Sequence, residues 1–185
     1  MKVLLLASGA GSLARAILEA RIADIEIVGL ISDKECGAIS MAQEFALATA
    51  IVEIEKDRSA WNQNLISAVS LYNPDLVVSV GFMRILAPEF LSQFPTINTH
   101  PALLPNFPGA HAVRDALVAG ATQTGCSVHW VDEGVDTGPV IAQKTLPILE
   151  SDTETSLHER IKILERSLIV EVLTSIAAQG IPGNR

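Results

Sequence analysis

Near its start the sequence reads Val3-Leu4-Leu5-Leu6-Ala7-Ser8-Gly9-Ala10-Gly11-Ser12, and residues of helical composition follow at 13–20. An uninterrupted apolar run is typical of a strand buried on both faces. A strand, a glycine turn and a helix in this order direct free backbone N–H groups at an anion. The turn also fits the loose G-x-G-x-x-G/A pattern, with Asp33 after the next strand, so a monophosphate site, a dinucleotide site and a plain tight turn all stay open. No Lys-Ser/Thr pair follows the glycines, which excludes a P-loop.

Apolar runs and helical patterns then alternate along the chain. We expect strands at 3–7, 25–32, 50–54, 76–80, 97–100, 125–131 and 140–145. We expect helices at 13–20, 38–46, 59–71, 88–94, 111–119 and 155–178, the last with Thr155 or a neighbour as its N-cap. This alternation predicts an α/β fold, a mostly parallel, Rossmann-like, doubly wound sheet with an antiparallel C-terminal hairpin. We expect one domain over residues 1–185 and a ligand site at the carboxyl ends of the strands.

Composition and charge narrow the class of protein. The net charge of −8, without a basic stripe, argues against nucleic acid or an anionic membrane as a partner. Cys36 and Cys126 form no C-x-x-C pair and fit a reduced cytoplasmic protein. The first apolar run is too short for a signal peptide, and no run reaches the roughly 18 residues of a membrane span. The predicted localisation is cytoplasmic, the predicted partners are small molecules, and a homodimer is left open.

The chemistry is concentrated between residues 98 and 138. Asn98 and His100 lie two residues apart in a predicted strand, so their side chains project from the same face. Pro101 then ends the strand pairing. Asp136 follows in an Asp- and Gly-rich turn that joins two predicted strands. An amide donor, an imidazole and a carboxylate are the groups that an acyl-type transfer needs, although each of the three could equally be structural.

A metal site and a nucleophilic triad are the two other kinds of site that this region could form. His100, His111, His129, Asp132 and Asp136 are close in sequence, but their spacings match no metal-ligand pattern, so no metal is predicted. His129, between Val128 and Trp130 in a strand, is interpreted as a hydrogen-bonded structural residue. No Ser or Cys occupies a G-x-S-x-G elbow, which argues against a nucleophilic triad.

These motifs also carry a resemblance that runs essentially from end to end. The chain resembles the phosphoribosylglycinamide formyltransferases, the folate-dependent family of purine biosynthesis and one-carbon metabolism. The matching segments are Ser8-Gly9-Ala10-Gly11-Ser12, Gly81-Phe82-Met83-Arg84-Ile85-Leu86, Asn98-Thr99-His100-Pro101-Ala102-Leu103-Leu104-Pro105 and Asp136-Thr137-Gly138-Pro139. Asn-x-His-Pro followed by Asp-x-Gly-Pro marks the wider formyltransferase superfamily, and the glycine loop narrows it to the glycinamide member.

The resemblance implies 10-formyltetrahydrofolate as the co-substrate, the amine of glycinamide ribonucleotide as the nucleophile, and no metal. It implies catalytic roles for Asn98, His100 and Asp136. It implies substrate contacts for Gly11, Ser12, Leu13, Lys162 and Glu165, where Leu13 replaces the family's usual asparagine and Lys162 its usual glutamine. The bland alternative for Glu165 is an exposed helix charge. Cofactor contacts are implied for Arg58, Met83, Arg84, Ile85, Leu86 and Asn98.

Three alternatives remain beside this interpretation. A hydrolase that releases formate would use water in place of the amine, but such enzymes usually carry an extra N-terminal domain, and here the first strand is expected at the start of the chain. Methionyl-tRNA formylation is disfavoured by the acidic charge and the lack of a C-terminal RNA-binding domain. A nucleotide-sensing module would need the glycine loop but not Asn98, His100 and Asp136 together.

Overall fold

The computed structural model describes residues 1–181. The chain forms two compact units, Met1–Asn98 and a second that begins at Thr99. The boundary lies inside strand β5 (Thr96–His100).

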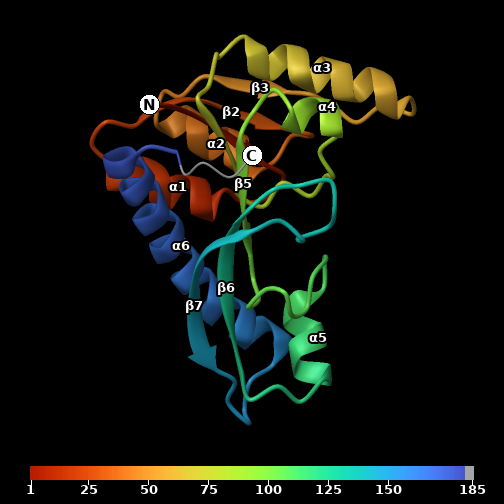
Figure 1. Ribbon diagram of the computed structural model, residues 1–185, viewed down its shortest axis with the longest axis vertical. Helices are drawn as coiled ribbons and strands as arrows, with labels where there is room; N and C mark the ends of the chain where they lie inside the picture. Colours follow the sequence, from red (N-terminus) through yellow and green to blue (C-terminus); the bar gives the residue numbers. More distant parts are fainter. Residues whose placement is uncertain (182–185) are drawn as a thin grey trace. The chain divides into compact units, whose positions relative to one another are not determined.

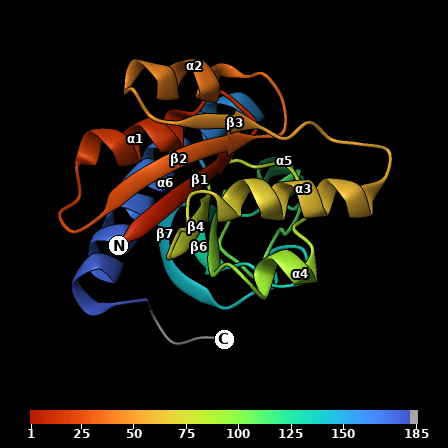
Figure 2. The ribbon, with the colours of Figure 1, turned by 90° about the horizontal axis from the view of Figure 1, so that it is seen from above.

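The first unit is a parallel sheet with helices on both faces. Its strand order is β3-β2-β1-β4-β5, and Figure 2 shows α1 and α2 on one face of the strands and α3 and α4 on the other. The elements are β1 (Lys2–Ala7), α1 (Ser12–Ala20), β2 (Glu26–Ser32), α2 (Gly37–Glu44), β3 (Thr49–Ile51), α3 (Arg58–Ser70), β4 (Leu76–Ser79) and α4 (Pro88–Leu91), followed by β5. This arrangement confirms the predicted doubly wound, mostly parallel sheet.

The strand order reverses between β1 and β4, and the register places several strand ends side by side. Ala7 lies opposite Ser32, Leu6 opposite Ser79, and Ser79 opposite Asn98. Side chains just beyond these carboxyl ends therefore meet at one edge of the sheet, where open α/β sheets bind their ligands. The edge carries the glycine turn and the segment after β4, as the sequence predicts.

Apolar burial explains why β1 lies at the centre of this unit. Leu4, Leu5 and Leu6 are fully buried, so both faces of the strand are covered. On the face covered by α3, Trp61 is also fully buried and stacks on Phe82 with the ring centroids 6.4 Å apart. The run of three leucines is therefore a core strand and not a membrane or signal segment.

The second unit is an antiparallel hairpin covered by a long helix. After β5 come α5 (Ala112–Val118), β6 (Gln123–Trp130), β7 (Val140–Pro147) and α6 (Glu154–Gln179). Strands β6 and β7 pair in antiparallel fashion, and Figure 1 shows α6 running along them. The hairpin confirms the predicted antiparallel C-terminal part. The register shifts between Val128 and His129, and such a bulge redirects the side chains that follow it.

Many element boundaries differ from the expected ones by one to three residues. The third strand ends at Ile51 and not at 54, because its partner β2 ends at Ser32, which lies opposite Ile51. The long helix begins one residue earlier than expected, at Glu154. Thr153 is its N-cap and forms a capping box with Ser156.

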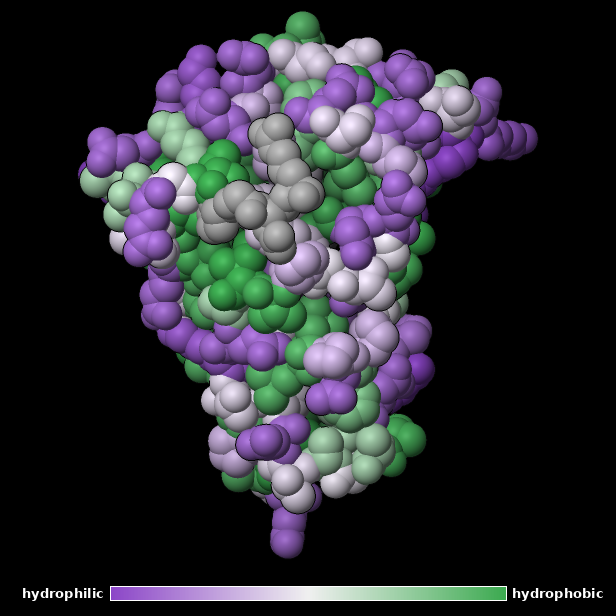
Figure 3. Space-filling view, in the orientation of Figure 1, coloured by the Kyte–Doolittle hydropathy of each residue, from purple (hydrophilic) through white to green (hydrophobic). Residues whose placement is uncertain are grey.

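Hydrophobic residues also reach the surface. Figure 3 shows them gathered near the centre of the visible face. A groove of about 200 Å³ between β7 and α6 is lined mainly by Ile141, Leu168, Val172 and Ile176. In the described part of the chain, none of the helices combines the length and the apolar character needed to cross a membrane.

The capping box gives a first testable expectation. The Thr153 hydroxyl accepts a hydrogen bond from the Ser156 N–H at 3.1 Å, so Thr153→Ala leaves that donor without its partner and should cost about 1 kcal/mol in the free energy of unfolding. Urea denaturation measures this loss. The matched control is Thr174→Ala in the interior of α6, where the hydroxyl only bonds back to the Val170 carbonyl. Equal losses in the two variants would contradict a specific role for the cap.

Candidate functional site

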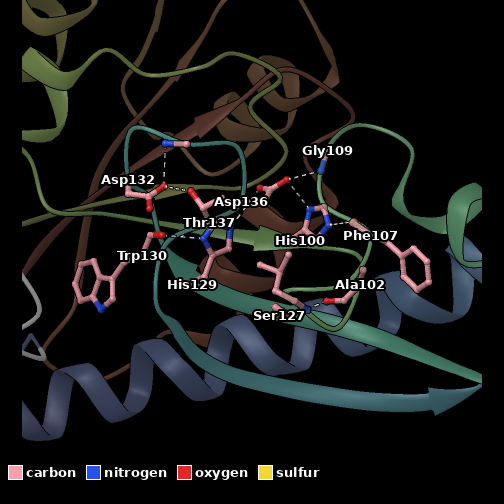
Figure 4. A network of polar contacts seen from close by, with 12 residues as sticks. His100, Ala102, Phe107, Gly109, Ser127, His129, Trp130, Asp132, Asp136 and Thr137 are labelled. Carbon is pink, nitrogen blue, oxygen red and sulfur yellow. Dashed lines mark hydrogen bonds and ion pairs between the residues drawn. The ribbon is translucent and has the colours of Figure 1, made fainter.

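An acidic side chain lies between two imidazoles in the second unit (Figure 4). Asp136 Oδ2 is 3.3 Å from Nδ1 of His100 and also accepts a hydrogen bond from the Gly109 N–H at 2.8 Å. Its other oxygen, Oδ1, is 3.5 Å from Nε2 of His129. The carboxylate therefore has donors on both oxygens, and its orientation is fixed.

Backbone carbonyls determine which ring nitrogens carry hydrogen. Nε2 of His100 is 2.8 Å from the Phe107 carbonyl, and Nδ1 of His129 is 2.8 Å from the Trp130 carbonyl. A carbonyl oxygen only accepts, so both of these nitrogens must be donors. The remaining nitrogen of each ring faces Asp136, and for His100 this contact is most favourable when the ring carries a second proton. The cluster is thus arranged to hold and release protons.

The charge on Asp136 is stabilised by these neighbours. Burial alone would raise the pKa of the Asp136 carboxyl, but the hydrogen bonds from His129 and Gly109 and the charges of both imidazoles together lower it. Asp136 is accordingly an anion at neutral pH.

His100 experiences opposing influences. Burial lowers the pKa of His100 below 6.5, with a smaller contribution in the same direction from His129, while the Phe107 carbonyl and Asp136 raise it. The imidazole is buried, so it loses the hydration that would favour its cation. A histidine in this balance gives up a proton readily and is suited to acid–base chemistry.

The loop after β5 is held to the hairpin by a buried serine. The Leu104 N–H donates to Ser127 Oγ at 3.0 Å, and the Ser127 hydroxyl donates to the Ala102 carbonyl at 2.6 Å. Gln143 on β7 donates to both Ser127 Oγ and the Leu104 carbonyl at 2.9 Å. These contacts fix the loop that carries the Phe107 carbonyl and the Gly109 N–H.

The turn that carries Asp136 has its own internal support. Asp132 Oδ1 accepts hydrogen bonds from the Thr137 hydroxyl at 2.7 Å and from the Gly134 N–H at 3.1 Å. Asp136 itself has a positive φ of 55°, a conformation that aspartate tolerates better than most residues. At Gly138, a Cβ would lie 1.9 Å from the Trp130 carbonyl oxygen, so only glycine fits there. The glycines of this turn thus permit the close approach that places Asp136.

The other predicted catalytic residue, Asn98, lies in β5 two positions before His100. It is half-buried and pairs with Ser79 of β4. The strand geometry puts Asn98 and His100 on the same face, as the sequence predicts.

The predicted phosphate-binding residues form the start of α1. Gly11 is its N-cap with a φ of 81°, and no side chain caps the helix. A Cβ on Gly11 would come within 2.8 Å of Ala38 Cα, so glycine is required both by conformation and by space. Ser12 is exposed and Leu13 half-buried. Such an N-terminus supplies backbone N–H donors to an anion.

The predicted folate-binding residues also lie together within the first unit. The Arg58 guanidinium donates to the Ile85 carbonyl and lies 4.2 Å from the centre of the Trp61 ring. Met83 and Ile85 are exposed and Leu86 is buried, while Arg84 pairs with Asp33. The segment therefore presents the side chains of Met83 and Ile85 to solvent.

Glu165 and Lys162 have different surroundings on α6. Lys162 pairs with Glu159 at 2.7 Å on the surface. Glu165 is only 5% exposed, so the alternative of an exposed helix charge is wrong. Burial raises the pKa of Glu165 to about 7, although a hydrogen bond from Thr99 and the charges of Lys162 and Arg166 oppose the shift.

Sequence reasoning missed the place of His129 beside Asp136. It identified a hydrogen-bonded residue but not the carboxylate as its neighbour. The available signal was the position of His129 at the end of the strand that leads into the Asp136 turn. Among residues 1–181, no group of three or more His, Cys, Asp or Glu side chains is placed to hold a metal ion.

The cluster predicts how His100 responds to the loss of its anion. Asp136→Asn removes a negative charge that stabilises the imidazolium, so the pKa of His100 should fall further below 6.5. Titration of the His100 ring protons by NMR measures the shift. Asp132→Asn is the matched control, because Asp132 lies in the same turn but bonds only within it. An unchanged or higher pKa of His100 in Asp136→Asn would refute the contact.

Glu165 predicts a pH-dependent difference in stability. The pKa of Glu165 rises from 4.5 to about 7 on folding, so the folded protein binds this proton more tightly than the unfolded chain does. The protonated side chain therefore contributes to stability at low pH, and the contribution is lost as the pH rises through about 7. Glu165→Gln should therefore gain stability over the unchanged protein between about pH 5 and about pH 8 in urea denaturation. Glu171→Gln, an exposed glutamate of the same helix whose pKa is lowered, should not show this gain. A constant difference across that range for Glu165→Gln would contradict the buried acid.

Comparisons with known proteins agree with this geometry. The model of the Formyl transferase family matches residues 1–173. The phosphoribosylglycinamide formyltransferase of Mycobacterium tuberculosis (strain ATCC 25618 / H37Rv) is 47% identical, with 97% of this chain and 86% of the relative covered. The enzyme of the same name from Escherichia coli (strain K12) is 36% identical, over 96% of this chain and 87% of the relative. The crystal structure of glycinamide ribonucleotide transformylase 1 from Symbiobacterium toebii is similar with a TM-score of 0.92 and 34% identity, over 96% of this chain and 88% of that one. The chain therefore belongs to the formyl transferase family and is an enzyme of that family.

Proposed function

We propose that this enzyme transfers a formyl group from 10-formyltetrahydrofolate to the amine of 5′-phosphoribosylglycinamide in purine biosynthesis. The observation that carries the proposal is the contact of His100 with the Asp136 carboxylate. His100 lies in the same strand as Asn98, and the chain belongs to the formyl transferase family. The names of the relatives support the choice of acceptor.

The proposed reaction is a direct attack of the amine on the formyl carbon, with negative charge developing on the formyl oxygen. The bond between the formyl carbon and N10 of the folate then breaks, and N10 leaves with a proton that balances the one lost by the amine. Asn98 would donate a hydrogen bond to that oxygen from its side-chain amide. His100 would donate a second hydrogen bond or deliver a proton. A preorganised donor of this kind typically contributes about 10²–10³ in rate.

Asp136 would act through His100 and on the proton that the amine loses. Its charge stabilises the imidazolium that forms when His100 accepts a proton. It could also receive the proton of the amine through a water molecule. The reaction needs no covalent intermediate, because the nucleophile is the substrate's own amine.

For the nucleotide substrate, the proposal assigns the phosphate to the start of α1. Gly11 and Ser12 would bind it through backbone N–H groups and the hydroxyl, and the backbone at Leu13 would replace the contact of the family's asparagine. Support comes from the uncapped N-terminus of α1 and from the absence of acidic residues in its first turn. Lys162 and Glu165 are proposed as further nucleotide contacts on the strength of the resemblance alone.

For the co-substrate, the proposal assigns the pterin ring to the segment of Met83, Arg84, Ile85 and Leu86, together with Asn98. 10-Formyltetrahydrofolate would supply the formyl group. The segment fits such a ring, because exposed apolar side chains and a fixed backbone suit a flat heterocycle with a hydrogen-bonding edge. Arg58 would attract the carboxylates of the folate tail.

We further propose that both units belong to a single formyltransferase domain, since one family model spans residues 1–173. A cytoplasmic location is consistent with two free cysteines in the described chain, Cys36 and Cys126. A homodimer stays a prediction.

The proposed function is tested by absorbance-monitored deformylation of 10-formyl-5,8-dideazafolate with and without 5′-phosphoribosylglycinamide. Turnover should require the nucleotide. His100→Ala should abolish it, and Asn98→Ala should lower it by about 10²–10³. His158→Ala, a histidine of α6 outside the cluster, serves as the control and should keep full activity.

Two outcomes would contradict the proposal. Turnover without the nucleotide would identify a hydrolase that uses water in place of the amine. Binding of nucleotide without turnover under either condition would favour a nucleotide-binding module.

A further inference from the structure

The segment after β4 is held at four successive points in the first unit. The Gly81 carbonyl accepts from the Ser8 N–H at 3.0 Å, and the Met83 N–H donates to Ser8 Oγ at 3.0 Å. Arg84 Nε donates to Asp33 Oδ2 at 2.6 Å, and the Ile85 carbonyl accepts from Arg58. These contacts are polar, and three of the four fix the backbone directly.

Asp33 connects two of these points. It follows β2, is only 2% exposed and lies beside both Ser8 and Arg84. Burial would raise the pKa of the Asp33 carboxyl, but the hydrogen bonds from Ser8 and Arg84 and the charge of Arg84 lower it. The Ser8 oxygen accepts from the Met83 N–H, and the Ser8 hydroxyl lies close enough to Asp33 to lower the pKa of that carboxyl. Asp33 thus orients the Met83 amide through Ser8 and the segment's next side chain directly.

We propose that Asp33 is a positioning residue for the co-substrate: acting through Ser8 and Arg84, it fixes the backbone of residues 83–85 in the conformation that receives the pterin ring. This inference rests on the proposed function. In this inference the Arg84 side chain stays paired with Asp33. Arg84 then contributes to the site through its backbone and does not bind the folate tail.

Burial of apolar surface holds this segment at Phe82 and Leu86, but it does not explain the order of the residues between them. Met83 is 70% exposed and Ile85 62% exposed, so little hydrophobic free energy holds them. The arrangement is also costly, because a buried carboxylate has lost its hydration and Asp33 Oδ1 has no hydrogen-bond partner among the described residues. Moving Arg84 to another anion would leave this buried charge unpaired. The Asp33–Arg84 pair costs free energy of hydration and yet orders residues that are otherwise exposed. This combination indicates that the pair determines the conformation of the site.

Asp33→Asn tests the inference, because asparagine keeps the size of the side chain but loses its charge and one acceptor. Calorimetric titration with 10-formyl-5,8-dideazafolate should give a dissociation constant raised about tenfold, the ratio that corresponds to one lost buried hydrogen bond. The KM for this compound should rise in step while kcat stays close to that of the unchanged protein. Hydrogen exchange of the Met83 amide should become faster.

Three controls separate this role from general destabilisation. Asp152→Asn breaks another Asp–Arg pair, with Arg160, and should lower stability without changing the dissociation constant. Ser8→Ala removes the hydroxyl between Asp33 and Met83 but leaves the pair of Asp33 with Arg84, and it should speed Met83 exchange and weaken binding even if Asp33→Asn fails to fold. The analogue without its glutamate tail, 10-formyl-5,8-dideazapteroate, should lose affinity for Asp33→Asn by the same factor as the complete compound.

The contrary results distinguish a failure of this inference from a failure of the proposed function. An unchanged dissociation constant in both Asp33→Asn and Ser8→Ala, with binding to the unchanged protein intact, would refute Asp33 as a positioning residue and leave the proposed function standing. Tighter binding of only the compound with the glutamate tail would show that Arg84 is a tail ligand once freed. Failure of the unchanged protein to bind either compound would instead contradict the proposed function.

Discussion

The Asp136 carboxylate is held by donors from three parts of the second unit: the imidazole of His100, the imidazole of His129 and the N–H of Gly109. The features around it all serve this orientation. Gly138 allows the close approach of the turn to β6, and Ser127 holds the loop that carries Gly109. Without the carboxylate, His100 would be a buried imidazole with little reason to accept a proton. Its acid–base chemistry depends on this one interaction.

The first unit contributes a second kind of order. Parallel strands bring their carboxyl ends to one edge, and the register places the ends of β1, β2 and β4 together there. Residues from three separate segments, Ser8, Asp33 and Arg84, can therefore form one polar network. The buried leucines of β1 supply the stability, and the polar side chains just beyond the strand ends supply the specific geometry.

Local patterns in the sequence were enough to predict the fold class and the strand that carries the proposed catalytic residues Asn98 and His100. Apolar runs mark buried strands, and Asn98 and His100 share a face because strand side chains alternate. The remaining details depend on contacts between distant segments, which no local pattern contains. The neighbour of His129 is set by a bulge in β6, the burial of Glu165 by the packing of α6, and the end of β3 by the end of its partner β2. The partner of Asp33 lies 51 positions away in the chain.

The central claim is that the amine attacks the formyl carbon directly while Asn98 and His100 stabilise the oxygen. The most direct test is to run the reaction of 10-formyl-5,8-dideazafolate with 5′-phosphoribosylglycinamide in water labelled with the heavy oxygen isotope. Mass spectrometry of the formylated product, sampled within the first turnovers, reads the origin of its formyl oxygen. Direct attack predicts that the oxygen of the donor is retained and that the product carries no label. Label in the product would show that water enters the reaction before the amine, and it would contradict the account.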